Sequence, residues 1–456
     1  MISGDTIAAI ATAPGRGGVA VVRVSGPEAF AIGERLTGKP PKAGRICLRE
    51  IGVGRVDRGI DVDIDHIDNR ISQPTDTYRR LSTSIDTGLL LAFKSPHSYT
   101  GEDVVEFQCH GGTVTPRRVL AACLAAGARL ARRGEFTERA FLNGRLDYAQ
   151  AESVLDLIDA KTVRAADAAL EGLSGHRARE VRALYESALD LSTRFEHALD
   201  IDEGELPVGF ADELRVASCE LRVKIEEAIR KANEGKLLRG GALVVLAGPP
   251  NAGKSSLLNA LLDENRAIVS DVPGTTRDTI EAWIDLDGWP IRLVDTAGLR
   301  ETKDAVEVEG VRRSEELLSK ADLVLWLGDP SSVSRLSSPV FKLHPKCDLG
   351  YGEGLNVSAK TGEGLDELKR AIVAKLEEKV ASSDDGDAPE GDVVAYQEAL
   401  ALLDGGRETR DARRGEDIVL LANAVRAAAE RLGEAIGATY SSDMLDNLFS
   451  RFCVGK

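Results

Sequence analysis

The chain has 456 residues, a length that predicts about three domains of ordinary size. Hydrophobic residues make up 43% and charged residues 29%, a mixture typical of a soluble globular protein with a substantial core. The formal net charge is −16, which argues against a protein that wraps nucleic acid over much of its surface, because phosphate contacts need many Lys and Arg side chains. A local basic patch, or a basic partner, is compatible with this charge.

Cysteine and histidine usage excludes several kinds of site. The six cysteines contain no C-x-x-C pair, and the six histidines contain no H-E-x-x-H motif. This pattern indicates reduced thiols and no zinc site. The N-terminus has no basic stretch before its short apolar run, so we do not expect a signal peptide. No apolar run approaches the ~18 residues that span a bilayer. We therefore expect a cytoplasmic protein without a membrane segment.

The first 145 residues predict an α+β domain. Strand-like runs at residues 6–10 and 19–24 flank the turn G-R-G-G at 15–18, and further strand-like pieces follow between 46 and 93. Residues 116–130 predict a helix. We place this domain at residues 1–145.

The remainder alternates between helical and mixed character. Apolar residues recur at helical spacing over 146–238, where one helix is expected to end at Gly235. Residues 239–380 alternate strands and helices, which predicts a parallel sheet. An acidic linker opens the last segment, 381–456, where the helical pattern returns. The fold class expected is therefore α/β plus α, with an α/β domain inserted into a helical domain.

Residues 248–255 carry the strongest chemical signal. They read G-P-P-N-A-G-K-S, which matches the phosphate-binding pattern G-x-x-x-x-G-K-[ST] between an expected strand and an expected helix. Its glycines let backbone N–H groups converge on phosphate oxygens at a helix N-terminus. Lys254 is expected to reach the β- and γ-phosphates of a nucleotide, and the Ser255 hydroxyl to ligate Mg²⁺.

Three further motifs follow in the order found in GTPases: G-T-T-R-D at 274–278, D-T-A-G at 295–298 and S-A-K at 358–360. Thr276 is expected to bind Mg²⁺ and the γ-phosphate, and Asp295 to hold the water shell of the metal. Together these motifs predict a GTP hydrolase with GTP as its substrate. The predicted GTP-binding residues are Asn251, Ala252, Gly253, Lys254, Ser255, Ser256, Ser270, Thr275, Thr276, Asp295, Thr296, Ala297, Gly298, Lys346, Asp348, Ser358, Ala359 and Lys360.

The guanine-reading motif departs from its usual form. N-K-x-D is replaced by Pro345-Lys346-Cys347-Asp348. Asp348 can still accept hydrogen bonds from the ring N–H and the exocyclic amine of guanine, whereas Pro345 cannot make the side-chain hydrogen bonds of the missing Asn. We expect GTP specificity with weaker affinity. The alternative is that this loop is displaced by the short connection after Asp329.

The chain as a whole resembles the MnmE (TrmE) family of tRNA-modification GTPases. Besides the GTPase motifs, the resemblance rests on residues 5–18, 99–103, 134–143 and 146–152 and on the terminal F-C-V-G-K at 452–456. It implies an N-terminal domain that dimerises and binds 5-formyltetrahydrofolate or a related one-carbon folate. It also implies a heterotetramer or larger complex with the FAD- and NADH-dependent partner MnmG. That complex would add a carboxymethylaminomethyl-type group to C5 of the wobble uridine of certain tRNAs.

The resemblance also implies roles for individual residues. Hydrolysis in the family depends on K⁺, and Glu307 falls at the position of the residue that orients the attacking water. Apart from the resemblance, Cys453 is a possible nucleophile, because a thiol could take part in one-carbon transfer. The potassium ligands implied are Asn251, Ser270, Val272 and Thr275, and the folate-binding residues implied are Arg23, Glu106, Arg145 and Lys456.

Two other functions compete with this enzyme. One is a regulatory GTP-binding module such as a ribosome-assembly factor, although such factors usually append a basic RNA-binding domain that this acidic chain does not offer. The other is a folate-binding scaffold with an inactive GTPase, which the retained Lys254, Ser255, Thr276 and Asp295 make less favourable.

Overall fold

The computed structural model describes residues 4–52, 84–200, 209–264, 281–296, 316–328, 339–381, 392–405, 414–436, 445 and 448–456. The chain divides into two compact units, one formed by residues 1–155 with 439–456 and the other by residues 156–438. The C-terminal residues therefore belong to the first unit. Each unit is described by itself.

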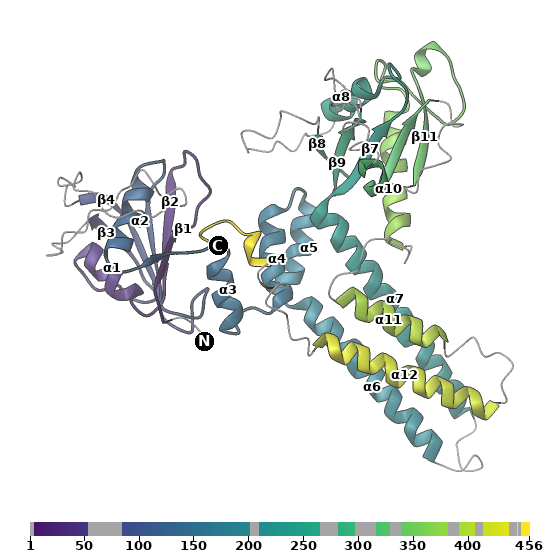
Figure 1. Ribbon diagram of the computed structural model, residues 1–456, viewed down its shortest axis with the longest axis horizontal. Helices are drawn as coiled ribbons and strands as arrows, with labels where there is room; N and C mark the ends of the chain where they lie inside the picture. The colour runs from purple at the N-terminus through teal and green to yellow at the C-terminus, as the bar shows by residue number, and fades with distance from the viewer. Residues whose placement is uncertain are drawn as a thin grey trace. The chain divides into compact units, whose positions relative to one another are not determined.

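The first unit is built on a mixed sheet (Figure 1). Within the described residues its strand order is β3-β4-β5-β2-β1-β6, and neighbours are antiparallel except for β1 and β6. The strands are β1 (Ile7–Ile10), β2 (Val19–Ser25), β3 (Ile46–Gly52), β4 (Ser84–Phe93), β5 (Val104–His110) and β6 (Arg129–Leu130). The helices are α1 (Ala29–Thr37), α2 (Thr115–Ala125), α3 (Glu135–Leu142) and α4 (Tyr148–Asp159), of which residues 148–155 belong to this unit.

The two faces of this sheet bury different side chains. Along β2, Val22 and Val24 are fully buried in a core shared with α1 and α2. Arg23 alternates with them and therefore lies on the opposite face. On that face Phe136 of α3 and Tyr99 pack with the β1 side chains in a smaller apolar cluster. Arg23 is thus a charged residue at the border of a second, thinner core.

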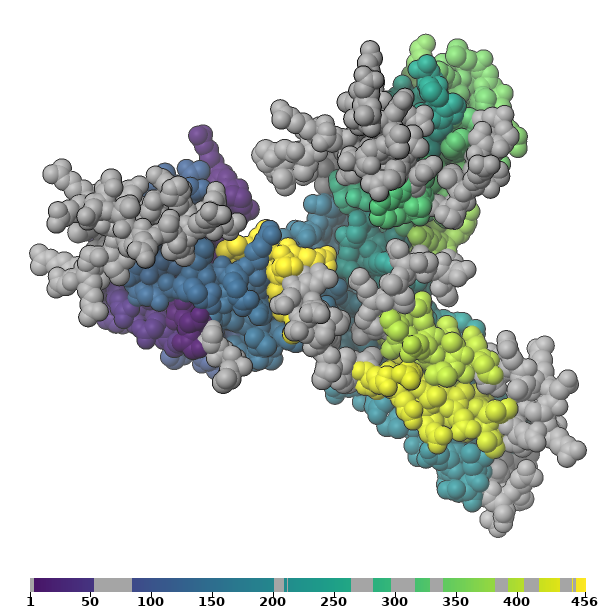
Figure 2. Space-filling view, viewed as in Figure 1, coloured from purple at the N-terminus to yellow at the C-terminus, as the bar shows by residue number. Residues whose placement is uncertain are grey.

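The C-terminal residues are packed into this unit. The Phe452 side chain is fully buried in a cluster with α4 and with Phe141, and the Phe449 and Phe452 ring centroids lie 6.2 Å apart. Figure 2 shows the yellow C-terminal tip lying directly on blue residues of the same unit. An isolated antiparallel bridge joins Val454 to Arg133, so the backbone of the last residues is fixed as well.

The second unit contains a largely parallel sheet. Within the described residues its order is β12-β11-β10-β7-β9-β8, with only β8 antiparallel to its neighbour. The strands are β7 (Ala242–Ala247), β8 (Glu281–Leu286), β9 (Trp289–Asp295), β10 (Leu323–Leu327), β11 (Val340–Pro345) and β12 (Leu355–Val357). Helices α8 (Lys254–Glu264) and α10 (Leu365–Ala381) pack on it, and a short 3-10 turn, η3, spans Cys347–Leu349. Every residue of β7 is buried, as expected for a central parallel strand.

Long helices make up the rest of the second unit. They are α5 (Val163–Leu173), α6 (His176–Asp200), α7 (Phe210–Gly240), α11 (Asp392–Gly405) and α12 (Arg414–Ile436). Buried side chains of α6, α7, α11 and α12 form one apolar cluster. Helices from before and after the sheet in sequence therefore share a core, and α7 leads directly into β7 (Figure 1).

Two helix boundaries differ from those expected. Helix α7 does not end at Gly235 but continues to Gly240. A glycine inside a helix costs about 1 kcal/mol, whereas burying Leu237 and Leu238 beyond it stabilises the helix by roughly 1.5–3 kcal/mol each. Helix α2 is shorter than expected: it ends at Ala125, Gly127 has a φ of 111°, and the following residues form β6 beside β1.

Candidate functional site

The phosphate-binding loop follows β7 at the carboxyl edge of the sheet. Gly248 has a φ of 143°, and a Cβ there would lie 2.2 Å from the carbonyl oxygen of Leu327, so only glycine fits. The Lys254 side chain is buried, and its Nζ donates hydrogen bonds to the carbonyl oxygens of Gly248 at 3.0 Å and Pro249 at 2.8 Å. The ammonium group therefore lies over the loop, where it can meet phosphate oxygens.

A hydroxyl and a carboxylate meet beside this loop. Ser255, in the first turn of α8, donates a hydrogen bond of 2.6 Å from Oγ to Oδ2 of Asp295 at the end of β9. Asp295 is fully buried, and the next residue, Thr296, donates from Oγ1 to the Leu246 carbonyl oxygen at 3.0 Å. Oxygen ligands of this kind suit Mg²⁺. This donor set therefore fits the metal expected from the sequence.

The residues expected to read guanine lie at the same edge. Asp348, in η3, accepts a hydrogen bond of 2.8 Å at Oδ1 from the Ser358 hydroxyl, which follows β12. Lys346 adopts a positive φ of 59°, and its Nζ donates to the carbonyl oxygen of Asn251 at 3.0 Å. The loop after β11 is therefore tied both to the phosphate loop and to the S-A-K segment, which argues against the displaced loop considered above.

The described motif residues converge because they follow parallel strands. The carboxyl ends of β7, β9, β11 and β12 share one edge of the sheet, the usual ligand site of α/β folds. Ala252 and Gly253 belong to the loop itself, Ser256 lies exposed in the first turn of α8, and Ala359 and Lys360 directly follow Ser358. Phosphate, metal and base contacts can therefore be made by a single nucleotide.

Several expected residues lie outside the described residues. They are Ser270, Val272, Thr275, Thr276, Ala297, Gly298 and Glu307. In the part of the chain that the structure describes, no cluster of three His, Cys, Asp or Glu side chains could hold a metal.

The four residues associated with folate all belong to the first unit, and two of them form an ion pair. Arg23 on β2 and Glu106 on β5 are register partners, and Arg23 Nε lies 2.8 Å from Glu106 Oε1. Both side chains are largely buried, with 17% and 15% exposed. The Arg23 guanidinium also lies 5.2 Å from the Tyr99 ring centroid and 5.5 Å from that of Phe136. Packing between rings and a carboxylate fixes the orientation of this cation.

Two residues that hold Arg23 in place, Tyr99 and Phe136, are not singled out by any motif in the sequence. Tyr99 is packed at the second core, and burial raises the pKa of its hydroxyl. That hydroxyl lies 2.8 Å from Thr137 Oγ1 on α3. Tyr99 and Phe136 do occur in segments that carry the family resemblance, but residue spacing gives no sign that both rings meet one arginine.

Arg145 and Lys456 approach the same region by different routes. Arg145 Nε donates a hydrogen bond of 3.2 Å to the carbonyl oxygen of Ser98, the neighbour of Tyr99. Gly455 is buried against β1, since a Cβ there would lie 2.1 Å from the carbonyl oxygen of Ile10. Lys456 thus follows Gly455, which is held beside β1, the strand that pairs with β2. The Cys453 side chain, also in this C-terminal segment, is exposed.

Buried ion pairs hold α3, the helix that carries Phe136 and Thr137, in place. Glu135 and Arg139, one turn apart on α3, have side chains 3% and 4% exposed and form an ion pair. Arg139 also pairs with Asp5 and Glu102. Burial acts to raise the pKa of Glu135, but hydrogen bonds from Arg129 and from the Arg132 backbone outweigh it and lower that pKa. α3 is therefore held in place by ionised groups.

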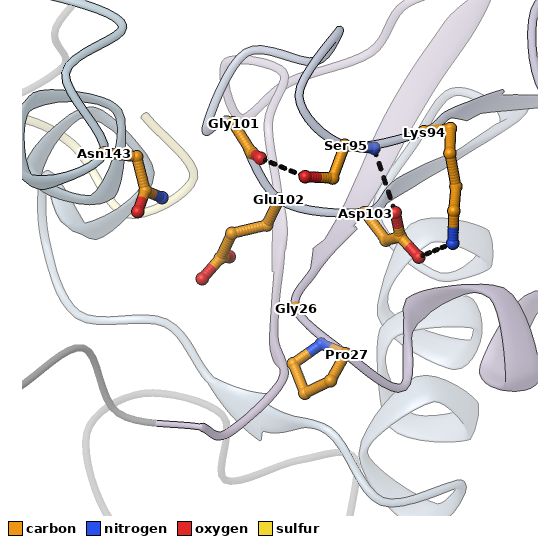
Figure 3. Close-up of a pocket in the computed structure, with 8 residues that line it drawn as sticks. All are labelled: Gly26, Pro27, Lys94, Ser95, Gly101, Glu102, Asp103 and Asn143. Carbon is orange, nitrogen blue, oxygen red and sulfur yellow. Dashed lines mark hydrogen bonds and ion pairs between the residues drawn. The ribbon is translucent and has the colours of Figure 1, made fainter.

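A shallow pocket of about 470 Å³ lies near this network (Figure 3). It is lined by Gly26, Pro27, Lys94, Ser95, Gly101, Glu102, Asp103 and Asn143. Its charges are already engaged, because Asp103 accepts from Lys94 Nζ at 2.6 Å and from the Ser95 backbone N–H at 3.0 Å. The Glu102 carboxylate pairs with Arg139. We assign this pocket no ligand.

Family models cover most of the chain. One described as "GTP-binding protein TrmE N-terminus" matches residues 6–145, and one described as "MnmE helical domain" matches residues 148–453. Among the described residues, no helix is long and apolar enough to cross a membrane.

Curated relatives match over the full length. The "tRNA modification GTPase MnmE" of Symbiobacterium thermophilum is 41% identical over 486 residues, covering 99% of both chains. The protein of the same name from Heliobacterium modesticaldum is 40% identical and covers 99% of this chain and 100% of its own.

Among solved structures, the G domain of the T. maritima FeoB iron transporter is 28% identical and covers 29% of this chain and 98% of its own. The TM-score of this match is 0.23.

Proposed function

The chain belongs to the MnmE family of tRNA modification GTPases, and we propose that it hydrolyses GTP at the carboxyl edge of its second sheet to drive the modification of tRNA. The family resemblance in the sequence is thereby confirmed. The observation that carries the proposal is the convergence of Lys254, the Ser255–Asp295 pair and the Asp348–Ser358 pair on one edge of that sheet.

Each of these groups has a distinct task. The Lys254 ammonium neutralises charge on the β- and γ-phosphate oxygens, a role supported by its position over the loop. Ser255 and Thr276 are the proposed protein ligands of Mg²⁺, and Asp295 orients the water around it. When bound, Mg²⁺ neutralises the charge that develops on the phosphate oxygens. Asp295 is buried and so keeps its carboxylate in one orientation.

Guanine is read by Asp348. The ring N–H and exocyclic amine of guanine both donate hydrogen bonds, and a carboxylate accepts both, whereas adenine offers no such pair. The Ser358 hydroxyl supports this task by fixing one carboxylate oxygen. Asp348 lies in the loop between β11 and β12, residues 346–354, which we name the base-reading loop. Lys346 supports guanine recognition by joining this loop to the phosphate-binding loop.

The chemical step is proposed to depend on K⁺ and on Glu307. Asn251, Ser270, Val272 and Thr275 are the proposed ligands of the cation, of which Asn251 lies in the described phosphate loop. A bound cation there stabilises charge between the β- and γ-phosphates, as an arginine finger does in other GTPases. Glu307 orients the attacking water, since Leu299, directly after D-T-A-G, cannot.

A one-carbon folate is the proposed ligand of the first unit. Arg23, Arg145 and Lys456 offer cationic donors for folate carboxylates and ring carbonyls, and Glu106 offers an acceptor for ring N–H groups. The support is the fixed arrangement of Arg23 with Glu106 and the attachment of Val454 to Arg133 and of Gly455 to β1, the strand that pairs with β2. Cys453 is exposed and available as a thiol, and its role in one-carbon transfer is part of this proposal.

The proposed assembly is a homodimer that works with an FAD- and NADH-dependent MnmG-like partner and with tRNA in the cytoplasm. Support for the homodimer comes from Ile46 and Leu48 on β3, each 67% exposed, and Leu89 on β4, 37% exposed. Leu48 is the register partner of Leu89, and Ile46, two residues before Leu48, lies on the same sheet face. A second copy can cover these side chains. The proposed product carries a carboxymethylaminomethyl group at C5 of the wobble uridine.

The test is complementation of a deletion strain. Mass spectrometry of tRNA nucleosides should show that the wobble-uridine modification disappears on deletion and returns with the wild-type gene. Lys254→Ala should fail to restore it, whereas Lys375→Ala, on the exposed side of α10, should restore it. Unchanged wobble uridines in the deletion strain would exclude the proposed function.

A further inference from the structure

The base-reading loop needs support that its sequence does not supply. Pro345 ends β11, in register with Val357 of β12, where GTPases usually have an Asn whose side chain ties this loop to its neighbours. Proline has neither a side-chain donor nor a backbone N–H. Asp348, three residues on, must nevertheless be held in one orientation to accept two hydrogen bonds from guanine.

Two side-chain hydrogen bonds link the segment after β11 to the segment after β12. The first joins Ser358 Oγ to Asp348 Oδ1 at 2.8 Å. The second joins the Tyr351 hydroxyl to Glu363 Oε1 at 2.6 Å. Tyr351 lies three residues after Asp348, and Glu363 lies five residues after Ser358. The two bonds therefore hold the segments together at separate points, which fixes orientation better than one.

Glu363 is attached to the same turn that carries Ser358. The Ser358 backbone N–H donates to the Glu363 carbonyl oxygen at 2.9 Å, which closes the turn. The Glu363 carboxylate also lies beside the buried thiol of Cys347, the residue before Asp348. The pKa of the Cys347 thiol is raised, mainly by burial and to a smaller extent by the Glu363 carboxylate. The hydrogen bond to the same carboxylate raises the pKa of the Tyr351 hydroxyl. Two contacts thus join Glu363 to the loop after β11, one with Tyr351 and one with Cys347, and its carbonyl oxygen joins it to the turn of Ser358.

We propose that Glu363 and Tyr351 are positioning residues for guanine recognition, taking over the bracing that the Asn absent at position 345 provides elsewhere. They do not touch the base. Their hydrogen bond keeps Asp348 aimed at the ring N–H and exocyclic amine. This inference rests on the proposed GTP site and adds to it the residues on which base selectivity depends.

The test compares dissociation constants for GDP and IDP, measured by calorimetry on the full chain. IDP lacks the exocyclic amine, so the ratio of the two constants reports how well Asp348 is aimed. Tyr351→Phe and Glu363→Ala should each weaken GDP binding by about three- to tenfold, the usual net value of one hydrogen bond. IDP binding should change less, so the preference for GDP should fall.

Three further variants sharpen the result. The double variant should lose no more selectivity than either single one, since both remove the same bond. Glu363→Gln should retain most of it, because an amide oxygen still accepts from Tyr351. Glu378→Ala, which removes an exposed ion pair on α10, is the control and should change neither constant.

The GDP and IDP dissociation constants of the variants separate the positioning role from the GTP site itself. An unchanged preference for GDP in Tyr351→Phe and Glu363→Ala, or equal losses for GDP and IDP, would overturn the inference. Asp348→Ala distinguishes this failure from failure of the GTP site itself. If Asp348→Ala weakens GDP binding while Tyr351→Phe does not, only the positioning role is wrong. If Asp348→Ala leaves GDP binding intact, the proposed site is wrong as well.

Discussion

The Ser255 hydroxyl lies 2.6 Å from the buried Asp295 carboxylate, which joins the first turn of α8 to the end of β9. The two residues are 40 positions apart in the chain and belong to separate GTPase motifs. Their contact brings together the proposed metal ligand and the carboxylate proposed to orient the metal's water, beside the phosphate-binding loop.

Neutralising this carboxylate should impair hydrolysis more than nucleotide binding. Asp295→Asn keeps the shape of the side chain but removes its charge, so we expect GTP hydrolysis to fall by about 100-fold. GDP binding measured without Mg²⁺ should stay close to normal. Asp366→Asn, on the exposed surface of α10, is the matched control. Hydrolysis at the wild-type rate in Asp295→Asn would rule out the assigned role.

Potassium should accelerate hydrolysis relative to sodium, and Asn251 should be needed for the difference. Asn251 has a positive φ of 59°, so Asn251→Ala, the simplest variant, also strains the loop. Asn251→Gly removes the amide oxygen without that strain. We expect both variants to lose the response to potassium, measured as turnover in matched potassium and sodium salts. Equal turnover of the wild-type protein in the two salts would refute the cation site.

Glu307→Ala should lower kcat and leave GTP affinity nearly unchanged. Orientation of the attacking water matters in the transition state and contributes little to binding of the ground state. Single-turnover hydrolysis and equilibrium binding of a non-hydrolysable analogue separate the two effects. Lost binding in this variant would show that Glu307 has another role.

The C-terminal residues should divide into a structural and a functional part. Phe452 is fully buried, so Phe452→Ala should destabilise the protein by about 3–5 kcal/mol. Removing residues 452–456 would therefore combine loss of packing with loss of any ligand contact. Lys456→Ala and Cys453→Ser change exposed or half-exposed groups and should leave the melting temperature and the rate of GTP hydrolysis unchanged.

The modification assay then assigns the function of these two residues. We expect Lys456→Ala to abolish wobble modification and to weaken binding of 5-formyltetrahydrofolate. Cys453→Ser separates a reactive thiol from a bystander, because a hydroxyl is a far weaker nucleophile at neutral pH. Normal modification in Lys456→Ala would remove this residue from the proposed folate site.

Glu135 should stabilise the first unit in a pH-dependent way. Its pKa is lowered from 4.5 in the folded protein, so its contribution is present above pH 4.5 and is lost as the pH falls through the folded value. Glu135→Gln should cost about 3 kcal/mol at pH 7, the scale of a broken buried ion pair, and less in acid. Thermal melts of the full chain at several pH values measure this, with the more exposed Glu138→Gln as control. A difference independent of pH would contradict the assignment.

The sequence by itself determined the features that depend on neighbouring residues. The phosphate loop is one, because eight consecutive residues supply its glycines, its lysine and the start of its helix. The strands β1, β2, β7 and β9 are others, since their apolar patterns reflect burial on one or both faces. The order of the GTPase motifs indicated that they would meet, because parallel strands end at the same edge.

Only the tertiary structure decided which distant side chains touch. Arg23 and Glu106 are 83 residues apart, and their ion pair follows from the register of β2 and β5, which no local pattern specifies. The bond between Tyr351 and Glu363 joins two exposed residues that spacing alone leaves as ordinary surface groups. The end of α7 was decided in the same way, because burial of Leu237 and Leu238 outweighed the low helix propensity of Gly235. All three depend on contacts between separate elements of the fold, which a short window of sequence does not contain.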